Sequence, residues 1–213
     1  MANDNNAALV ETVKSILGVQ AISDEIFDAM LRVDRGLFVP QKYSSLAYND
    51  TQIPISSGVF MQPPSIISLM LNMAKIRPGL NVLEIGTCTG YSTAIISELV
   101  QSGKVTSVEQ SFEMYQTAKK NIQSLQRVNN KEYSIELVFG DVSLGYWSNG
   151  PYDVLISNYA SKELPLDFVK QLKLDGRAII PIGDSSSQML LSYEKITNTI
   201  YTKPISVRFP LLK

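Results

Sequence analysis

The stretch that most constrains the fold of this chain lies at residues 81–91, which read NVLEIGTCTGY. Its apolar start is typical of a short strand buried on both faces of a parallel sheet. Gly86 and Gly90 then bound a turn that a ligand can approach closely, because glycine has no side chain. A helical pattern at residues 92–100 follows, so the free N–H groups at its start would face whatever occupies the turn. The order of strand, glycine turn and helix predicts a nucleotide-binding unit.

Acidic side chains lie at the ends of the predicted strands. An apolar segment at residues 105–108 ends at Glu109, about as far downstream as nucleotide-binding folds place the acid that holds a ribose. Asp141 follows a later apolar segment and can accept from an exocyclic amine, whereas Glu84 can orient the turn or reach the ligand. Ligands of such sheets bind beyond the carboxyl ends of the strands, so we expect one shared crevice. The other residues that we predict there are Gly86, Thr87, Gly90, Gln110, Gly140 and Val142.

The glycine turn has the pattern E-x-G-x-x-x-G, which favours a cofactor without phosphate groups. A dinucleotide-binding turn needs a further glycine where Cys88 stands, and no Gly-Lys-Ser/Thr sequence for a triphosphate is present. Cys88 itself has no basic neighbour in the sequence, so we interpret it as a structural residue. The acids suit a positively charged sulfur and a hydroxylated ribose better than anions. The sequence therefore predicts S-adenosylmethionine as the cofactor.

The composition is that of a globular enzyme domain. The 213 residues suffice for one full core, and 45% hydrophobic against 18% charged residues argue against disorder. A formal net charge of −1 gives no overall basic field that would attract nucleic acid or an anionic membrane, although it does not exclude a local basic patch. The first residues show no secretory signal and no apolar run can cross a bilayer, so we expect a cytoplasmic protein without a membrane or nucleic-acid partner.

Histidine is absent and cysteine occurs once. These counts exclude an internal disulfide, a Cys/His zinc site and a Ser-His or Cys-His nucleophile pair. Acid and base work would fall to Asp, Glu, Tyr or Lys side chains. The chain therefore favours a reaction whose difficult chemistry belongs to a cofactor, and we expect no metal.

Helical and strand patterns alternate along the chain. Helical spacing predicts helices at residues 8–17, 23–33, 65–74, 92–100, 112–125 and 164–172. Residues 43–64, which prolines interrupt, predict a loop without regular structure. Besides the two strands above, we predict strands at residues 135–139, 152–157, 177–182, 188–195 and 205–209. An α/β fold follows, with a doubly wound, mostly parallel sheet, an antiparallel edge and an N-terminal helical extension.

Short motifs between Phe38 and Gly183 are shared with one known family. They are LFVP at 37–40, LAYND at 46–50, IPI at 53–55, VLEIGT at 82–87, GY at 90–91, GD at 140–141, LGY at 144–146, PYD at 151–153 and GRAIIPIG at 176–183. In these motifs, which stay in register over most of its length, the chain resembles the protein-L-isoaspartate (D-aspartate) O-methyltransferase family.

The resemblance implies a single class I S-adenosylmethionine-dependent methyltransferase domain over residues 1–213, with a Rossmann-like seven-stranded sheet and that family's rearrangement of the C-terminal strands. Residues 1–75 would supply the N-terminal helices and the substrate loop, and residues 76–213 the cofactor-binding sheet. The activity implied is methylation of L-isoaspartyl carboxylates in damaged proteins, a protein repair reaction, by a monomer or weak homodimer. The residues that would carry the cofactor are Glu84, Gly86, Glu109 and Asp141, and Gln188 matches a cofactor-side glutamine of the family.

The loop that carries the family's active-site serine departs from the family pattern. The family usually reads GQTISAPH there, whereas residues 58–65 of this chain read GVFMQPPS, so Gln62 replaces the serine and Ser65 the histidine. Methyl transfer to a carboxylate needs alignment and desolvation more than a base, so losing a hydroxyl need not abolish it. We place Gln62 and Asp50 at the acceptor entrance as candidate catalytic residues, with loop ordering as the alternative role of each.

Two other functions stay open. The acceptor could be a small-molecule carboxylate or a nitrogen, with residues 157–159 acting like the polar and aromatic motif of amino methyltransferases, although the two prolines of that motif are missing. A protein that binds the cofactor without transferring a methyl group is the non-enzyme alternative. Tyr91 and Tyr159 lie near the predicted crevice, where each can pack or present a ring face to the sulfonium.

Overall fold

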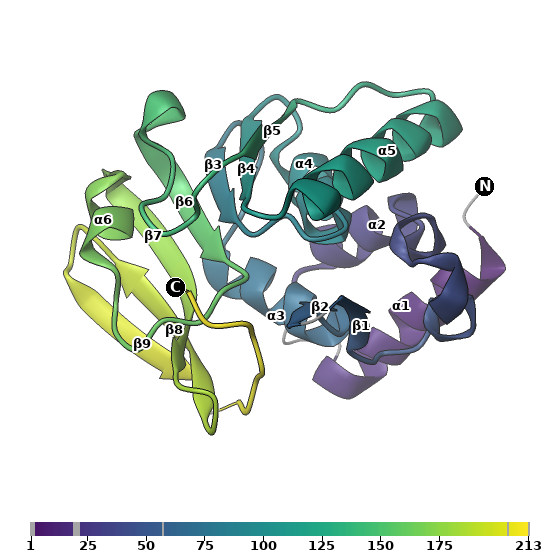
Figure 1. The fold of residues 1–213 in the computed structure, drawn as a ribbon, viewed down its shortest axis with the longest axis horizontal. Coiled ribbons are helices and arrows are strands. Elements are labelled where there is room, and N and C mark those ends of the chain that lie inside the picture. Colours follow the sequence, from purple (N-terminus) through teal and green to yellow (C-terminus); the bar gives the residue numbers. More distant parts are fainter. Residues whose placement is uncertain (1–2, 19–21, 57, 204, 213) are drawn as a thin grey trace.

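A seven-stranded sheet runs through the computed structural model, which describes residues 3–18, 22–56, 58–203 and 205–212 (Figure 1). The strand order is β5-β4-β3-β6-β7-β8-β9, with the first five strands parallel and β8 antiparallel to both of its neighbours. This confirms the mostly parallel sheet with an antiparallel edge. The strands are β3 (Asn81–Ile85), β4 (Lys104–Glu109), β5 (Ile135–Phe139), β6 (Tyr152–Ser157), β7 (Leu172–Gly183), β8 (Gln188–Glu194) and β9 (Thr199–Lys203).

The central strands are apolar on both faces because each face covers a separate core. Val82 of β3 lies beside Val154 of β6, and both belong to the first hydrophobic core. Leu83 lies beside Leu155 in the next register position, and both belong to the second core. Successive strand residues point to opposite faces, so a continuous apolar run fills both cores.

The helices cover the two faces unequally. The first core takes side chains from α1 to α5, whereas the second takes its helical contribution from the short α6. The connection from β5 to β6 holds a 3-10 turn, η3 (Trp147–Asn149), in place of an α-helix. No helix of the described ranges is both long and apolar enough to cross a membrane. The helices are α1 (Asp4–Leu17), α2 (Asp24–Arg32), α3 (Pro64–Ala74), α4 (Tyr91–Val100), α5 (Phe112–Asn129) and α6 (Leu166–Lys170).

The segment at residues 43–64 is more regular than predicted. Two 3-10 turns, η1 (Arg35–Phe38) and η2 (Gln41–Leu46), precede an antiparallel hairpin of β1 (Ile53–Ser56) and β2 (Val59–Met61). Ile53 and Ile55 are buried while Pro54 is exposed, which is the alternation of a strand with one covered face. Proline hides this pattern in the sequence but is tolerated at the edge of a two-stranded sheet.

The C-terminal part also differs from the prediction. Residues 205–209 were expected to form a strand, but the last strand is β9 at Thr199–Lys203. Residues 205–209 belong instead to the C-terminal segment (residues 205–212), which lies outside the named strands and bonds to Gln188 and Ala160. The predicted helix at 164–172 is shorter, because β7 already begins at Leu172.

Candidate cofactor and acceptor site

The strand order reverses at β3, which has β4 on one side and β6 on the other. Such a reversal opens a crevice at the carboxyl ends of parallel strands, where ligands of open α/β sheets bind. The glycine turn follows β3, Glu109 ends β4, and Asn158 and Tyr159 follow β6. The structure therefore brings together three of the segments predicted from sequence.

Glu84 lies below the turn and not in the crevice. Its side chain is fully buried, and its two carboxylate oxygens accept four hydrogen bonds from side chains of three different elements. Burial raises the pKa of Glu84, while the four donors oppose that rise. Of its two predicted roles, orienting the turn is the one that these contacts support. The donors are Ser92 Oγ (2.5 Å), Thr93 Oγ1 (2.5 Å), Ser107 Oγ (2.7 Å) and Asn158 Nδ2 (3.1 Å).

Glu109 lies at the boundary between the sheet and the crevice. Its Oε2 accepts from the backbone N–H of Cys88 in the turn at 2.9 Å, and its Oε1 accepts from the N–H of Ser111 at 2.9 Å. Burial raises the pKa of the Glu109 carboxyl against the opposing effect of these N–H donors. This strand end beside the turn is where nucleotide-binding folds place the acid that holds a ribose, but Glu109 is buried here and each of its oxygens accepts a backbone N–H, so the ribose contact stays a prediction.

The glycine turn is held from both sides. Thr87 is buried, and its Oγ1 lies 2.7 Å from Ser107 Oγ, which itself donates to Glu84. Gly90 has φ of 89°, and a Cβ there would lie 3.2 Å from Ile122 of α5, so glycine lets α4 start close to α5. Cys88 has φ of 52° and a pKa raised to about 12 by burial, in keeping with its structural interpretation.

Asp141 marks the outer end of the crevice. The backbone N–H of Gly140 donates to the Glu109 carbonyl at 3.0 Å, which joins the ends of β4 and β5. Asp141 is exposed, and the N–H of Ser143 holds the pKa of its carboxyl below the usual value. Val142 is buried in the second core, so only its backbone can face a ligand.

Tyr159 closes the crevice between β4 and β6. A Cβ on Gly86 would lie 2.7 Å from Cε2 of the Tyr159 ring, so the ring rests directly on the glycine. The Tyr159 hydroxyl accepts a hydrogen bond from Gln110 Nε2 at 2.9 Å, and burial raises the pKa of Tyr159 to about 12. The neighbouring Asn158 Nδ2 donates to the Gly86 carbonyl at 2.8 Å and to Glu84, so the amide nitrogen holds the turn.

Gln62, at the position of the family's serine, is held by the C-terminal segment. Its Nε2 donates to the carbonyl of Arg208 at 2.9 Å, and its Oε1 accepts from Gln52 Nε2 at 3.2 Å. Gln52 also donates to the Arg208 carbonyl, at 2.9 Å. Gln62 therefore lies at the predicted entrance with both of its amide atoms engaged.

Gln188, the glutamine implied by the resemblance, holds the same C-terminal segment. Its Oε1 accepts from the N–H of Phe209 at 2.7 Å, and its Nε2 donates to the carbonyl of Phe209 at 3.1 Å and of Asp184 at 3.0 Å. The C-terminal segment also pairs with Ala160 through the Pro210 carbonyl and the Leu212 N–H. The contacts of Gln188 thus support a structural role at the rim.

Asp50 ties the loop before β1 to the start of α3. Its Oδ1 accepts from the backbone N–H of Ser65 at 2.8 Å and its Oδ2 from the Ser65 hydroxyl at 2.6 Å. Ser65 lies in the first turn of α3, where free N–H groups favour a carboxylate. These contacts support loop ordering over substrate contact.

Arg35 is a residue of this region that the sequence did not single out. Its guanidinium is fully buried and donates to four backbone carbonyls of the loop and hairpin, while desolvation lowers its pKa. The only sequence signal was its place just before the LFVP motif. The carbonyls are those of Ala47 (3.1 Å), Asn49 (2.8 Å), Thr51 (3.1 Å) and Gln62 (3.4 Å).

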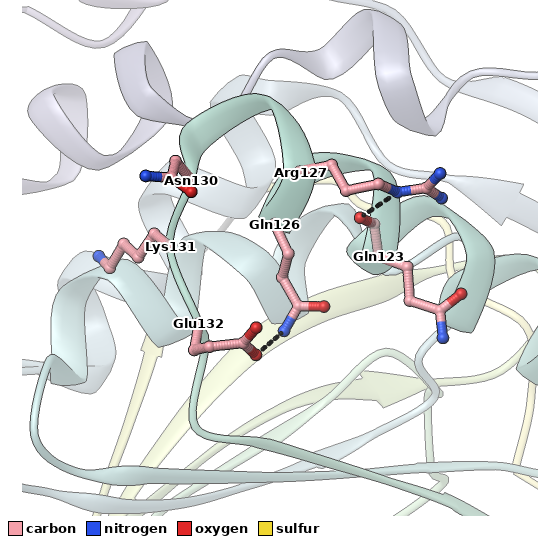
Figure 2. A pocket seen from close by; sticks show the side chains of 6 residues that line it. All are labelled: Gln123, Gln126, Arg127, Asn130, Lys131 and Glu132. Atoms are coloured by element: carbon pink, nitrogen blue, oxygen red, sulfur yellow. Dashed lines mark hydrogen bonds between the residues drawn. The ribbon is translucent and has the colours of Figure 1, made fainter.

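Two hollow spaces lie in this crevice. The inner space of about 20 Å³ is lined by the turn, Gln62 and Asn158, and is large enough for about one water molecule. The outer space of about 380 Å³ is lined by the hairpin, Gln110, Tyr159 and the C-terminal segment. Another depression, of about 430 Å³, lies at the C-terminal end of α5, near the amino end of β5 and so away from the crevice. Figure 2 shows that Gln126 donates there to the Glu132 carboxylate and Arg127 to the backbone carbonyl of Gln123.

The residues at the crevice fit an adenosyl cofactor in their chemistry. Glu109 supplies a carboxylate beside the turn, Asp141 an exposed carboxylate at the next strand end, and Gly86 a position where a Cβ would block close approach. The approach to Gly86 is taken by the Tyr159 ring. The roles of these residues in cofactor binding stay predictions.

Comparisons with known proteins agree on one family. The family model described as protein-L-isoaspartate(D-aspartate) O-methyltransferase matches residues 4–212. Protein-L-isoaspartate O-methyltransferase 2 of Archaeoglobus fulgidus is 34% identical over 194 residues, which are 90% of this chain and 86% of that protein. The protein-L-isoaspartate O-methyltransferase of Pyrococcus horikoshii is 37% identical over 161 residues, 76% of this chain and 70% of that protein.

Two solved structures that are described as protein-L-isoaspartate O-methyltransferases share the fold of this chain. A protein-L-isoaspartate O-methyltransferase aligns with a TM-score of 0.81 and 30% identity over 95% of this chain, which spans 65% of the length of that chain. A structure from Plasmodium falciparum, described as a putative enzyme of this kind in complex with S-adenosyl-L-homocysteine, aligns with a TM-score of 0.84 and 24% identity over 99% of both chains. Because the second structure shares only 24% of its sequence with this chain, it supports the fold and not the activity.

Proposed function

The chain belongs to the protein-L-isoaspartate(D-aspartate) O-methyltransferase family, and from this premise we propose that it methylates L-isoaspartyl carboxylates of damaged proteins with S-adenosylmethionine as the donor. The observation that carries the proposal is the family match over residues 4–212 together with the Glu109 carboxylate beside the turn after β3. The repair of damaged proteins, a cytoplasmic location and a monomeric or weakly dimeric state belong to the same proposal.

Methyl transfer to a carboxylate needs little acid or base catalysis. When bound, S-adenosylmethionine supplies a methyl group on a positively charged sulfur. The acceptor carboxylate is already a nucleophile at neutral pH, so the protein has to align it in line with the methyl group and exclude water. The hairpin and the C-terminal segment, joined by Gln52 and Gln62, are the parts placed to cover the acceptor.

A methyl-transfer assay tests the proposal. The protein is incubated with methyl-labelled S-adenosylmethionine and a peptide that contains one isoaspartyl residue, and a peptide with aspartate at the same position is the matched control. We expect labelling of the isoaspartyl peptide alone. Binding of S-adenosylhomocysteine without such labelling would contradict the acceptor while supporting the cofactor.

The variant Gln62→Ser tests whether isoaspartate is the native acceptor. The substitution restores the family's hydroxyl and releases the Arg208 carbonyl from one of its two donors. If Gln62 serves isoaspartate, the variant is expected to be no more active than the wild type. Activity on the isoaspartyl peptide in the variant alone would place the native acceptor in another chemical class. Gln123→Ser, exposed on α5, is the matched control.

A further inference from the structure

Tyr159 occupies the approach to the glycine that the cofactor needs. The ring is so close that a single added carbon on Gly86 would overlap it, at 2.7 Å from Cε2 and 3.0 Å from Cδ2. Only 7% of Tyr159 is exposed, so the ring fills this place as a core side chain would. A ligand cannot contact Gly86 on this side while the ring stays there.

Tyr159 also lies where the crevice is divided. Phe60 lines both hollow spaces, Asn158 lines the inner one and Tyr159 lines the outer one. The boundary therefore runs along Phe60 and the peptide of Asn158 and Tyr159. The inner space of about 20 Å³ is far below the roughly 300 Å³ at which small-molecule sites begin. The outer space of about 380 Å³ already exceeds that size, but the inner space beside the turn reaches it only when it joins the outer one.

We propose that Tyr159 is a gate to the cofactor crevice: its ring covers Gly86 in the closed state and turns into the outer space to admit S-adenosylmethionine. This inference rests on the proposed function, because it assumes that the cofactor binds against the turn.

The contacts of Tyr159 allow its side chain to move while its backbone stays fixed. Ser157 Oγ donates to the Tyr159 carbonyl at 2.7 Å and accepts from its N–H at 3.1 Å, which holds the main chain. The ring, by contrast, has one polar contact in the described structure, with the exposed side chain of Gln110. The outer space of about 380 Å³, which Tyr159 itself lines, gives the ring room to turn.

If Tyr159 is a gate, the wild type binds its cofactor more weakly than a protein whose crevice is always open. When only a fraction of the molecules is open, the apparent Kd rises by the inverse of that fraction. Tyr159→Phe removes the hydrogen bond to Gln110 and keeps the ring, and we expect it to bind about fivefold more tightly. Tyr159→Ala removes the ring as well, and we expect at least about tenfold tighter binding.

Calorimetry with S-adenosylhomocysteine as the probe tests the gate without relying on turnover. Circular dichroism checks that each variant is folded, and if Tyr159→Ala does not fold, Tyr159→Phe alone decides. Tyr201→Ala, an exposed tyrosine of β9, is the matched control and is expected to keep the wild-type affinity.

The outcomes separate the gate from the proposed function. Binding that is tightest for Tyr159→Ala, weaker for Tyr159→Phe and weakest for the wild type supports the gate. Binding by the two variants but not by the wild type supports it as well. Equal or weaker binding by Tyr159→Phe and Tyr159→Ala overturns it, and weaker binding would make the ring a wall of the cofactor site. A wild type and variants that all fail to bind would overturn the proposed function itself, and the gate with it.

Discussion

Three acidic side chains that look alike in the sequence lie in three different environments. Glu84 is buried among hydroxyl and amide donors, Glu109 lies between the turn and the crevice, and Asp141 is exposed at the outer strand end. Glu84 and Glu109 are both buried, at 0% and 2% exposure, so of the three Asp141 is the carboxylate that is open to a ligand in this structure.

Glu109→Gln tests the ribose contact. The variant keeps the size of the side chain but loses the charge and one acceptor, and a hydrogen bond to a charged group contributes about 1.5–3 kcal/mol. We expect the Kd for S-adenosylhomocysteine to rise by roughly tenfold to a hundredfold, measured by calorimetry. Glu136→Gln, on the half-buried edge strand β5, is the control and should bind as the wild type does. An unchanged Kd for Glu109→Gln would remove Glu109 from the site.

The buried Glu84 predicts a pH dependence of stability. Because burial raises its pKa in the folded state, the folded protein retains a proton that the unfolded chain has lost between the two pKa values. Stability from this group therefore falls as the pH rises from about 4.3, the ordinary pKa of glutamate, through the raised folded pKa. The expected slope is roughly 1.4 kcal/mol per pH unit over that range.

Glu84→Gln cannot ionise and should lack this slope. Urea unfolding at several pH values gives the difference in the free energy of unfolding between the wild type and the variant. That difference should change in favour of the variant as the pH rises. Glu113→Gln, an exposed residue of α5, should keep the wild-type dependence. A difference that is independent of pH would mean that Glu84 has the same pKa in both states.

The residues of the site were predictable to the extent that their place follows from chain order. Gly86 and Glu109 end consecutive parallel strands, so their meeting follows from the strand pattern alone. The partners of Glu84 come from α4, β4 and the segment after β6, and no local pattern links them. Arg35 was missed for the same reason, since its partners are backbone carbonyls that carry no sequence signal.

At the scale of elements, Arg35 joins the loop at residues 47–51, before β1, to Gln62, between β2 and α3. The variant Arg35→Met keeps most of the apolar contact but leaves buried carbonyls of the loop without donors. We expect a loss of about 2–5 kcal/mol in the free energy of unfolding, measured with urea. Arg127→Met, whose exposed guanidinium bonds to the carbonyl of Gln123 in the same helix, should cost less than about 0.5 kcal/mol. A similar small loss for both variants would contradict the role of Arg35.

The elements of the sheet were predictable because their period is local, whereas the C-terminal segment was not. Residues 205–209 alternate apolar and polar side chains as a strand does. The decisive bonds, however, come from the Gln188 side chain and from Ala160, which are distant in the sequence. β9 was missed because four of its five residues are exposed, so it lacks a covered face to give it a clear pattern.

At the scale of the whole molecule, the N-terminal helices and the sheet share one core. The first core contains Val13 of α1, Val105 of β4 and Ile179 of β7. A single domain over residues 1–213 stays a prediction, and a core that continues from the N-terminal helices to the sheet is what it requires.

The single domain predicts that damage in α1 is felt in β7. Val13→Ala removes two buried methyl groups, and we expect a loss of about 1–3 kcal/mol in the free energy of unfolding. Hydrogen exchange of the β7 amides, which needs global unfolding in a cooperative domain, should then be about tenfold faster. Ile16→Ala on the exposed side of the same helix is the matched control and should leave exchange in β7 nearly unchanged. If Val13→Ala accelerates exchange in α1 alone, the N-terminal helices unfold as a separate unit, because a shared core cannot lose stability at one end only.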